Sequence, residues 1–132
     1  MARQKKVLDA SIITKWFVSE AGSEAALALR EEHRNGKSLL IVPELAFLEV
    51  ANSLRFKSKE HIFLTESIQD LWKTQFYIER LNPDLLIQAV QLSLKHNLTV
   101  YDAVYLSVSI NHGCPLITAD KDLGKIKSTV LL

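Results

Sequence analysis

The sequence predicts an α/β fold, an α/β/α sandwich in which helices cover both faces of a central parallel sheet of four to five strands. Two observations lead to this class. Short apolar runs alternate along the chain with longer segments whose apolar residues recur at helical spacing. The run at residues 39–42 is continuously apolar, which is typical of a strand buried on both faces. We expect residues 1–132 to form a single domain.

The first strand is expected at residues 6–9, followed by a short helix at 11–17 that the hydroxyl of Ser11 can cap. A second helix is expected at 24–34. Its apolar residues follow the helical period, and Asn35-Gly36 can end it. This part of the chain therefore supplies one strand and two helices.

The run at 38–42 predicts the second strand, and proline suits a first helical position, so Pro43 is expected to begin the next helix. In the helix expected at 85–96, we expect Ile87, Val90 and Leu94 to face inward. The remaining elements complete the alternation of strands and helices. They are a helix at 62–74, a strand at 76–81, a helix from Tyr101 to Gly113, a strand at 115–118, a short helix at 119–123 and a strand at 129–131.

The composition is that of a globular chain long enough to bury a core without disulfides. Hydrophobic residues make up 48% and the mean hydropathy is +0.08, which favours a doubly covered sheet or a large partner interface. No apolar stretch is long enough for a membrane helix, and no signal peptide follows the basic start. The single cysteine, Cys114, is expected to be buried. We expect a cytoplasmic protein.

Four acidic residues each lie at the edge of an apolar segment: Asp9, Glu49, Asp102 and Asp120. Two of them follow predicted strands, where an α/β sheet forms its ligand crevice. The other two lie within or at the start of a helix and can be directed at the same crevice. Such a group is costly unless a cation neutralises it. We therefore predict that the four carboxylates share one divalent cation site and that this site cuts RNA.

Oxygen ligands without cysteine or histidine select Mg²⁺ or Mn²⁺. The reaction that follows is metal-assisted hydrolysis of a phosphodiester bond. Three polar residues, Ser11, Asn52 and Thr118, are candidates to hydrogen-bond the carboxylates or their waters. Each acid also has an ordinary explanation by itself, as a helix cap, a solvated helix position or a first-turn acid. Spacing alone leaves both readings open.

Basic residues near these acids are candidates to contact an RNA backbone. Arg55 and Lys57 extend the helix that carries Glu49, and Lys121 and Lys127 follow Asp120. The alternative, a solvated basic surface, is equally open. The histidines lie at helix ends or on polar faces, and no pair has metal-ligand spacing, so we expect no catalytic histidine.

Four segments, in this order, resemble the PIN-domain ribonuclease family and in particular the VapC toxins of bacterial and archaeal toxin–antitoxin pairs. They are Val7-Leu8-Asp9-Ala10-Ser11, Glu49-Val50-Ala51-Asn52, Tyr101-Asp102-Ala103 and Thr118-Ala119-Asp120. Each segment is short, but together they span nearly the whole chain in register.

The resemblance implies a PIN-like fold and an endoribonuclease that depends on Mg²⁺ or Mn²⁺. It makes Asp9, Glu49, Asp102 and Asp120 the acidic quartet around the metal, and Asp122 an additional acid of open role. It also implies a homodimer and a small antitoxin that holds the protein inactive. Two alternatives are a PIN-like module that binds RNA or protein with little catalysis, and a phosphatase or receiver domain. The latter would need paired acids after the first strand, where this chain has Ala10.

Overall fold

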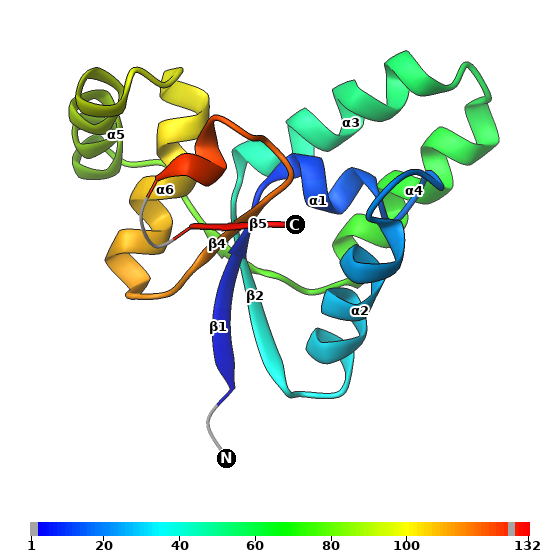
Figure 1. Ribbon diagram of the computed structural model, residues 1–132. Helices are drawn as coiled ribbons and strands as arrows, with labels where there is room; N and C mark the ends of the chain where they lie inside the picture. The colour runs from blue at the N-terminus through cyan, green and yellow to red at the C-terminus, as the bar shows by residue number, and fades with distance from the viewer. Residues whose placement is uncertain (1–2, 127–128) are drawn as a thin grey trace.

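The computed structural model describes residues 3–126 and 129–132, and it places five parallel strands in one sheet between two layers of helices (Figure 1). The strands are β1 (Gln4–Leu8), β2 (Ser38–Pro43), β3 (Tyr77–Glu79), β4 (Leu116–Thr118) and β5 (Thr129–Leu131). The helices are α1 (Ala10–Thr14), α2 (Ser23–Arg34), α3 (Leu45–Lys57), α4 (His61–Lys73), α5 (Pro83–His96) and α6 (Val100–His112), with a short 3-10 helix, η1, at Leu123–Lys125. The predicted α/β class and parallel sheet are confirmed.

The sheet has the strand order β3-β2-β1-β4-β5, so the first strand of the chain lies at its centre. Val7 is in register with Ile41 of β2 on one side and with Leu116 of β4 on the other. All three side chains are fully buried. A central parallel strand is covered on both faces, which explains the continuous apolar run of β2. The arrangement also brings the ends of β1 and β4 side by side.

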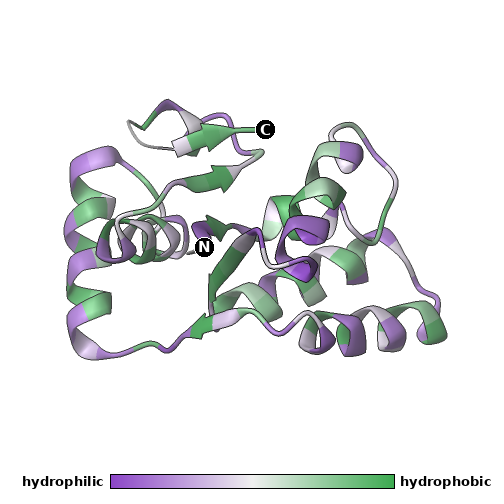
Figure 2. Ribbon diagram, turned by 90° about the horizontal axis from the view of Figure 1, so that it is seen from below, coloured by the Kyte–Doolittle hydropathy of each residue, from purple (hydrophilic) through white to green (hydrophobic). Residues whose placement is uncertain are grey.

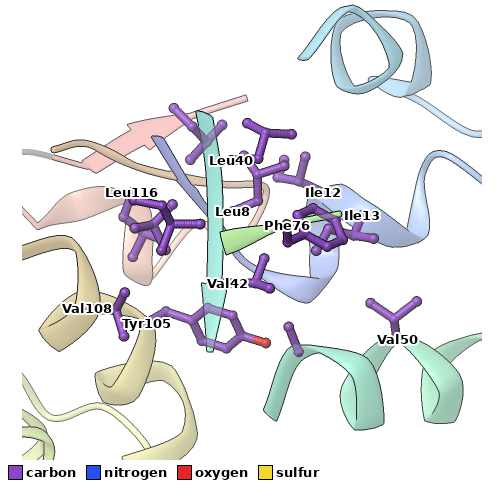
Figure 3. Close-up of a cluster of buried hydrophobic side chains, with 14 of the residues drawn as sticks. Leu8, Ile12, Ile13, Leu40, Val42, Val50, Phe76, Tyr105, Val108 and Leu116 are labelled. Carbon is purple, nitrogen blue, oxygen red and sulfur yellow. The ribbon is translucent and has the colours of Figure 1, made fainter. Parts of the chain in front are cut away.

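Helices from different parts of the chain cover the two faces. In Figures 1 and 2, α5 and α6 lie on one side of the strands, and α1 to α4 lie on the other. Apolar side chains from both layers meet the strands in one core (Figure 3). Ile12 and Ile13 come from α1, whereas Tyr105 and Val108 come from α6. Burial of each large apolar side chain contributes about 1.5–3 kcal/mol, so this core holds the crevice-forming elements in place.

Two predicted helix starts are corrected. The α1 helix is capped by Asp9, whose carboxylate accepts a hydrogen bond from the backbone N–H of Ile12 at 3.3 Å, and Ser11 lies inside the helix. Pro43 ends β2 rather than beginning α3. Proline has no N–H, and the backbone N–H of Glu44 instead donates to the carbonyl of Glu79 on β3 at 3.1 Å. The strand therefore keeps its pairing for one more residue.

The outer face of α5 contradicts the predicted burial. Ile87, Val90 and Leu94 are exposed, and Leu94 is 82% exposed. This helix packs on α6 rather than on the sheet, and its buried residues are Leu85 and Ala89. A helix in a second layer needs only a narrow apolar stripe, so the remaining apolar residues face outward.

Of His33 and Cys114, only Cys114 departs from expectation. His33 lies in the last turn of α2, at a helix end as expected, and it is buried; its Nδ1 accepts from the backbone N–H of Leu40, and its Nε2 lies 2.9 Å from the carbonyl oxygen of Thr74. Cys114 is only partly buried, because the turn between α6 and β4 lies at the surface. Neither residue lies at the carboxyl end of the sheet. Within residues 3–126 and 129–132, no helix is long and apolar enough to cross a membrane.

Candidate functional site

Asp9 lies at the carboxyl end of the central strand, where the chain turns into α1. It is only 6% exposed, yet its carboxylate has three hydrogen-bond donors. The hydroxyls of Ser11 and Thr118 donate to its two oxygens, and the N–H of Ile12 donates as well. Burial raises the pKa of Asp9, these three donors oppose the rise, and the charge of Asp102 adds to it. Asp9 is therefore held rigidly in a partly desolvated setting.

The two hydroxyls that hold Asp9 are themselves held by the loop after β4. The backbone N–H of Ala119 donates to the hydroxyl oxygen of Ser11 at 3.0 Å, and that of Asp120 donates to the hydroxyl oxygen of Thr118 at 2.9 Å. Each hydroxyl thus accepts one hydrogen bond from the backbone and donates one to the carboxylate of Asp9. The backbone N–H of Asp9 also donates to the carbonyl of Ile117. These bonds fix the end of β1 against the end of β4.

Glu49 reaches the same edge of the sheet from α3. It is half-buried, and its Oε1 accepts a hydrogen bond from the hydroxyl of Tyr105 on α6 at 2.6 Å. Burial raises the pKa of Glu49, the bond from Tyr105 opposes the rise, and the charges of Asp102 and Asp9 add to it. The carboxylate of Glu49 is therefore close enough to Asp102 and Asp9 for their charges to act on it.

Asp102 lies in the first turn of α6, and its backbone N–H donates to the hydroxyl of the capping residue Thr99. Its carboxyl group is half-buried. Burial raises the pKa of Asp102, Asp120 raises it further, the Thr99 hydroxyl opposes the rise, and Asp122 adds a smaller increase. Because its charge also raises the pKa of Asp9 and Glu49, Asp102 is the acid that interacts with all the others.

Asp120 and Asp122 lie in the turn that leads from β4 to η1. Oδ1 of Asp120 accepts from the backbone N–H groups of Asp122 and Leu123 at 2.8 and 3.2 Å. Asp122 extends into solvent and lies 3.7 Å from the Nζ of Lys125. One oxygen of Asp120 is therefore committed to the turn, whereas Asp122 faces outward.

Among the described residues, no lysine or arginine forms an ion pair with Asp9, Glu49, Asp102 or Asp120. Carboxylates elsewhere do have such partners, for example Glu32 with Lys6 at 2.9 Å. The same part of the chain holds no group of three or more acidic, histidine or cysteine side chains gathered tightly enough to enclose a metal ion. Mg²⁺ usually takes one or two carboxylates and keeps several waters. An open, all-oxygen set of repelling carboxylates fits that ion.

The other residues predicted for the site lie further away. Asn52 is exposed on α3 and makes no hydrogen bond to an acid in the described residues. Lys57 lies 3.2 Å from Glu20, which Lys15 also contacts, so its charge is partly engaged. Arg55 and Lys121 are exposed, and Lys127 lies outside the described residues. The structure therefore brings Ser11 and Thr118 to the acids, whereas Asn52 makes no hydrogen bond to an acid in the described residues.

Tyr105 is the site residue that sequence reasoning missed. It lies three residues after Asp102, which puts both on one face of α6, within a segment otherwise made of apolar and small residues. A buried tyrosine needs a partner for its hydroxyl, and the half-buried Glu49 supplies it. A tyrosine among the buried residues of this helix, three positions after a candidate acid, was the available signal.

The raised pKa values predict that ionisation of the acids opposes folding. A carboxyl group whose pKa is higher in the folded than in the unfolded state binds more protons when folded. Its contribution to stability is therefore present at low pH and is lost as pH rises from about 4 through the raised value. Asparagine cannot ionise. We expect Asp102→Asn, in EDTA, to gain stability relative to wild type as pH rises.

Urea unfolding at pH 4 and pH 7.5 measures this difference, and Asp84→Asn is the matched control. Asp84 is also a first-turn acid, but it is exposed on α5 and is not among the charges that act on Asp9, Glu49 or Asp102. A stability difference between Asp102→Asn and wild type that is the same at both pH values would contradict the expected repulsion.

A parallel sheet of this order, with carboxylates from separate elements meeting at its carboxyl edge, is the architecture of a nuclease-type α/β domain. The chain belongs to the PIN domain family, whose model matches residues 6–128. Within that family it is similar to Ribonuclease VapC3 of Pyrobaculum aerophilum. The two are 31% identical over an alignment of 131 residues, which covers 92% of this chain and 93% of the relative. The resemblance found in the four sequence segments is thus confirmed.

Two solved structures share the fold. VapC20 of Mycobacterium tuberculosis, described as a toxin that cleaves the sarcin–ricin loop, aligns with a TM-score of 0.73 at 18% identity, covering 90% of this chain and 92% of that chain. A toxin–antitoxin complex from Klebsiella pneumoniae aligns with a TM-score of 0.72 at 20% identity, covering 95% of both chains. At these identities the likeness concerns the fold.

Proposed function

We propose that this chain is a VapC-like endoribonuclease toxin, acting as one PIN domain, that hydrolyses RNA phosphodiester bonds with Mg²⁺ or Mn²⁺. The observation that carries the proposal is a set of carboxylates at the end of β1 and on α3 and α6. Asp9 is buried, Glu49 and Asp102 are half-buried, the charge of Asp102 acts on both others, and none of the three has a lysine or arginine partner in the described residues. Such a set is costly to keep unless it binds a cation. The relationship to Ribonuclease VapC3 supports RNA as the substrate.

Asp9, Glu49, Asp102 and Asp120 would hold the cation. When bound, the cation supplies positive charge that offsets the carboxylates and stabilises the negative charge developing on the phosphate. Ser11 and Thr118 keep both oxygens of Asp9 in one orientation, so that this ligand needs no rearrangement on binding. Asp102 is half-buried and its charge acts on Asp9 and Glu49, and it can accept a proton from the attacking water.

Exposed basic residues around the crevice would contact the RNA backbone. Arg55 and Lys121 are free of ion pairs with described residues, whereas Lys57 would first have to leave Glu20. Contacts of this kind add affinity without sequence preference and weaken as salt rises. We place this activity in the cytoplasm, where such a substrate is available.

We further propose that a small antitoxin neutralises the protein and that the protein forms a homodimer. Support comes from exposed apolar surface on both sides of Leu48, which is 73% exposed on α3. A groove of about 650 Å³ lies between Leu48 and Trp72, and a second of about 450 Å³ lies between Leu48 and Tyr101. Contiguous exposed apolar surface is typical of protein interaction sites. The toxin–antitoxin complex of the same fold supports the antitoxin as one occupant.

The test is cleavage of a mixed single-stranded RNA pool by wild type and Asp9→Asn, each with Mn²⁺ or with EDTA. We expect cuts only for wild type with Mn²⁺. Asparagine can still cap α1, so the variant keeps the local fold. Cleavage that persists in EDTA and in Asp9→Asn would contradict the proposal. RNA retention by both proteins without any cleavage would instead favour a binding module.

A further inference from the structure

The bond between Tyr105 and Glu49 joins the two helical layers at the carboxyl edge of the sheet. Tyr105 belongs to α6 and Glu49 to α3, and the two helices lie on opposite faces of the sheet. Figure 3 shows the ring of Tyr105 in the core beside Val42, with its hydroxyl directed away from α6. The residue is 1% exposed, so the hydroxyl reaches Glu49 from inside the protein.

Burying a tyrosine at this core position costs more free energy than burying an apolar side chain of the same size, unless its hydroxyl is hydrogen-bonded. Phenylalanine would fill the same volume without bringing a polar hydroxyl out of water, a step that costs free energy unless a hydrogen bond compensates it. Here the compensation comes from a charged acceptor at 2.6 Å, which makes the stronger kind of hydrogen bond. Packing alone therefore does not account for the hydroxyl, whereas an effect on Glu49 does.

We infer that Tyr105 is a positioning residue, which fixes Oε1 of Glu49 and thereby orients the second carboxylate oxygen for the cation. Glutamate has several rotatable bonds and, on a half-exposed helix face, loses side-chain freedom when it is ordered. A preformed bond from the core means that this ordering is complete before the cation arrives. The inference rests on the proposed function, because it assigns Glu49 to the cation site.

A similar arrangement holds Asp9. The hydroxyls of Ser11 and Thr118 donate to its two carboxylate oxygens. Tyr105 likewise donates its hydroxyl proton to Oε1 of Glu49. Two of the carboxylates at this edge of the sheet are thus oriented by hydroxyl groups, and two of these hydroxyls, those of Thr118 and Tyr105, come from elements far away in the sequence.

The test is the affinity for Mn²⁺ of Tyr105→Phe, measured from the electron paramagnetic resonance signal of free Mn²⁺ without RNA. We expect the affinity to fall about 10- to 100-fold, the usual effect of losing a partner that orients a metal ligand. The matched control is Ser107→Ala. It removes another buried hydroxyl of α6, one that donates to Gln88 and does not touch the acids. The control should bind Mn²⁺ like wild type.

A double-mutant cycle with Glu49→Gln distinguishes positioning from a general structural effect. We expect Tyr105→Phe to cost little further affinity when Glu49 is already replaced, because there is no carboxylate left to orient. Glu49→Asp, which keeps the charge but withdraws it from the hydroxyl, should lose affinity as Tyr105→Phe does. This second variant is at a half-exposed position and does not endanger the core.

Three results would overturn the inference. They are unchanged Mn²⁺ affinity in Tyr105→Phe, wild-type affinity in Glu49→Asp, or an equal loss from Tyr105→Phe with and without Glu49→Gln. In each case, Asp102→Asn in the same assay shows whether the proposed function has also failed. Loss of Mn²⁺ binding there would keep the carboxylate site and reject only the role of Tyr105.

Discussion

Asp102→Asn is expected to lower the rate of RNA cleavage at least about a hundredfold, the upper end of the effect of losing an outer partner of a metal ligand. Asp102 is the carboxylate whose charge acts on Asp9 and Glu49 and is acted on by Asp120. The exchange removes a charge at the centre of the group while preserving side-chain shape. The fold should survive, because Asp102 is only half-buried and α6 keeps its cap at Thr99. Initial rates with saturating Mn²⁺ measure the effect.

Asp84→Asn again provides the control, since it removes a first-turn acid from α5 at an exposed position. Its cleavage rate should equal that of wild type. Cleavage by Asp102→Asn at the wild-type rate would exclude Asp102 as an essential ligand. A loss accompanied by unfolding in far-ultraviolet circular dichroism would count against the stated reason, because repulsion predicts a variant that is at least as stable at neutral pH.

The second expected result is that Mn²⁺ raises the melting temperature of wild type by roughly 5–10 °C at a concentration about 100 times its dissociation constant. Binding to the folded state alone at that ratio contributes about 2.7 kcal/mol, and each 1 kcal/mol shifts the melting temperature of a domain this size by a few degrees. The cation also relieves repulsion among Asp9, Glu49 and Asp102. Thermal melts with Mn²⁺ and with EDTA measure the shift.

Asp102→Asn should reduce this shift and should start from a higher melting temperature in EDTA, whereas Asp84→Asn should behave like wild type. The two effects have one cause, because the charge that weakens the folded protein without the cation is the charge that binds it. A shift of equal size in wild type and Asp102→Asn would indicate that Mn²⁺ binds elsewhere on the protein.

The strands and helices follow from local sequence. Apolar runs that need cover on both faces predicted the central strands, and Gly36 and Gly113 predicted the ends of α2 and α6. Errors arose where a neighbouring strand or helix decided the outcome. Pro43 stays in β2 because β3 offers a backbone partner to Glu44, and Ile87 and Leu94 face outward because α5 packs on α6.

For the candidate site, sequence reasoning selected the residue types, and the fold decided their relations. The acids, Ser11 and Thr118 could be named from one chain, because each lies at the edge of an apolar segment and two of the acids follow predicted strands. Distances between residues far apart in sequence depend on how the layers pack. Only the three-dimensional structure shows that Thr118 holds Asp9 and that Tyr105 reaches Glu49 across 56 positions of the chain.

The sequence by itself therefore determined the fold class, the family and the chemical character of the crevice. These depend on local patterns of apolar and acidic residues, and the same patterns determine the secondary structure. The tertiary structure decided which hydroxyl orients which carboxylate. It also decided that, within the described residues, Asn52 makes no hydrogen bond to an acid and the acids are not gathered tightly enough to enclose a metal ion. Those outcomes depend on the packing of α3 and α6 on opposite faces of the sheet, a long-range property that no single segment encodes.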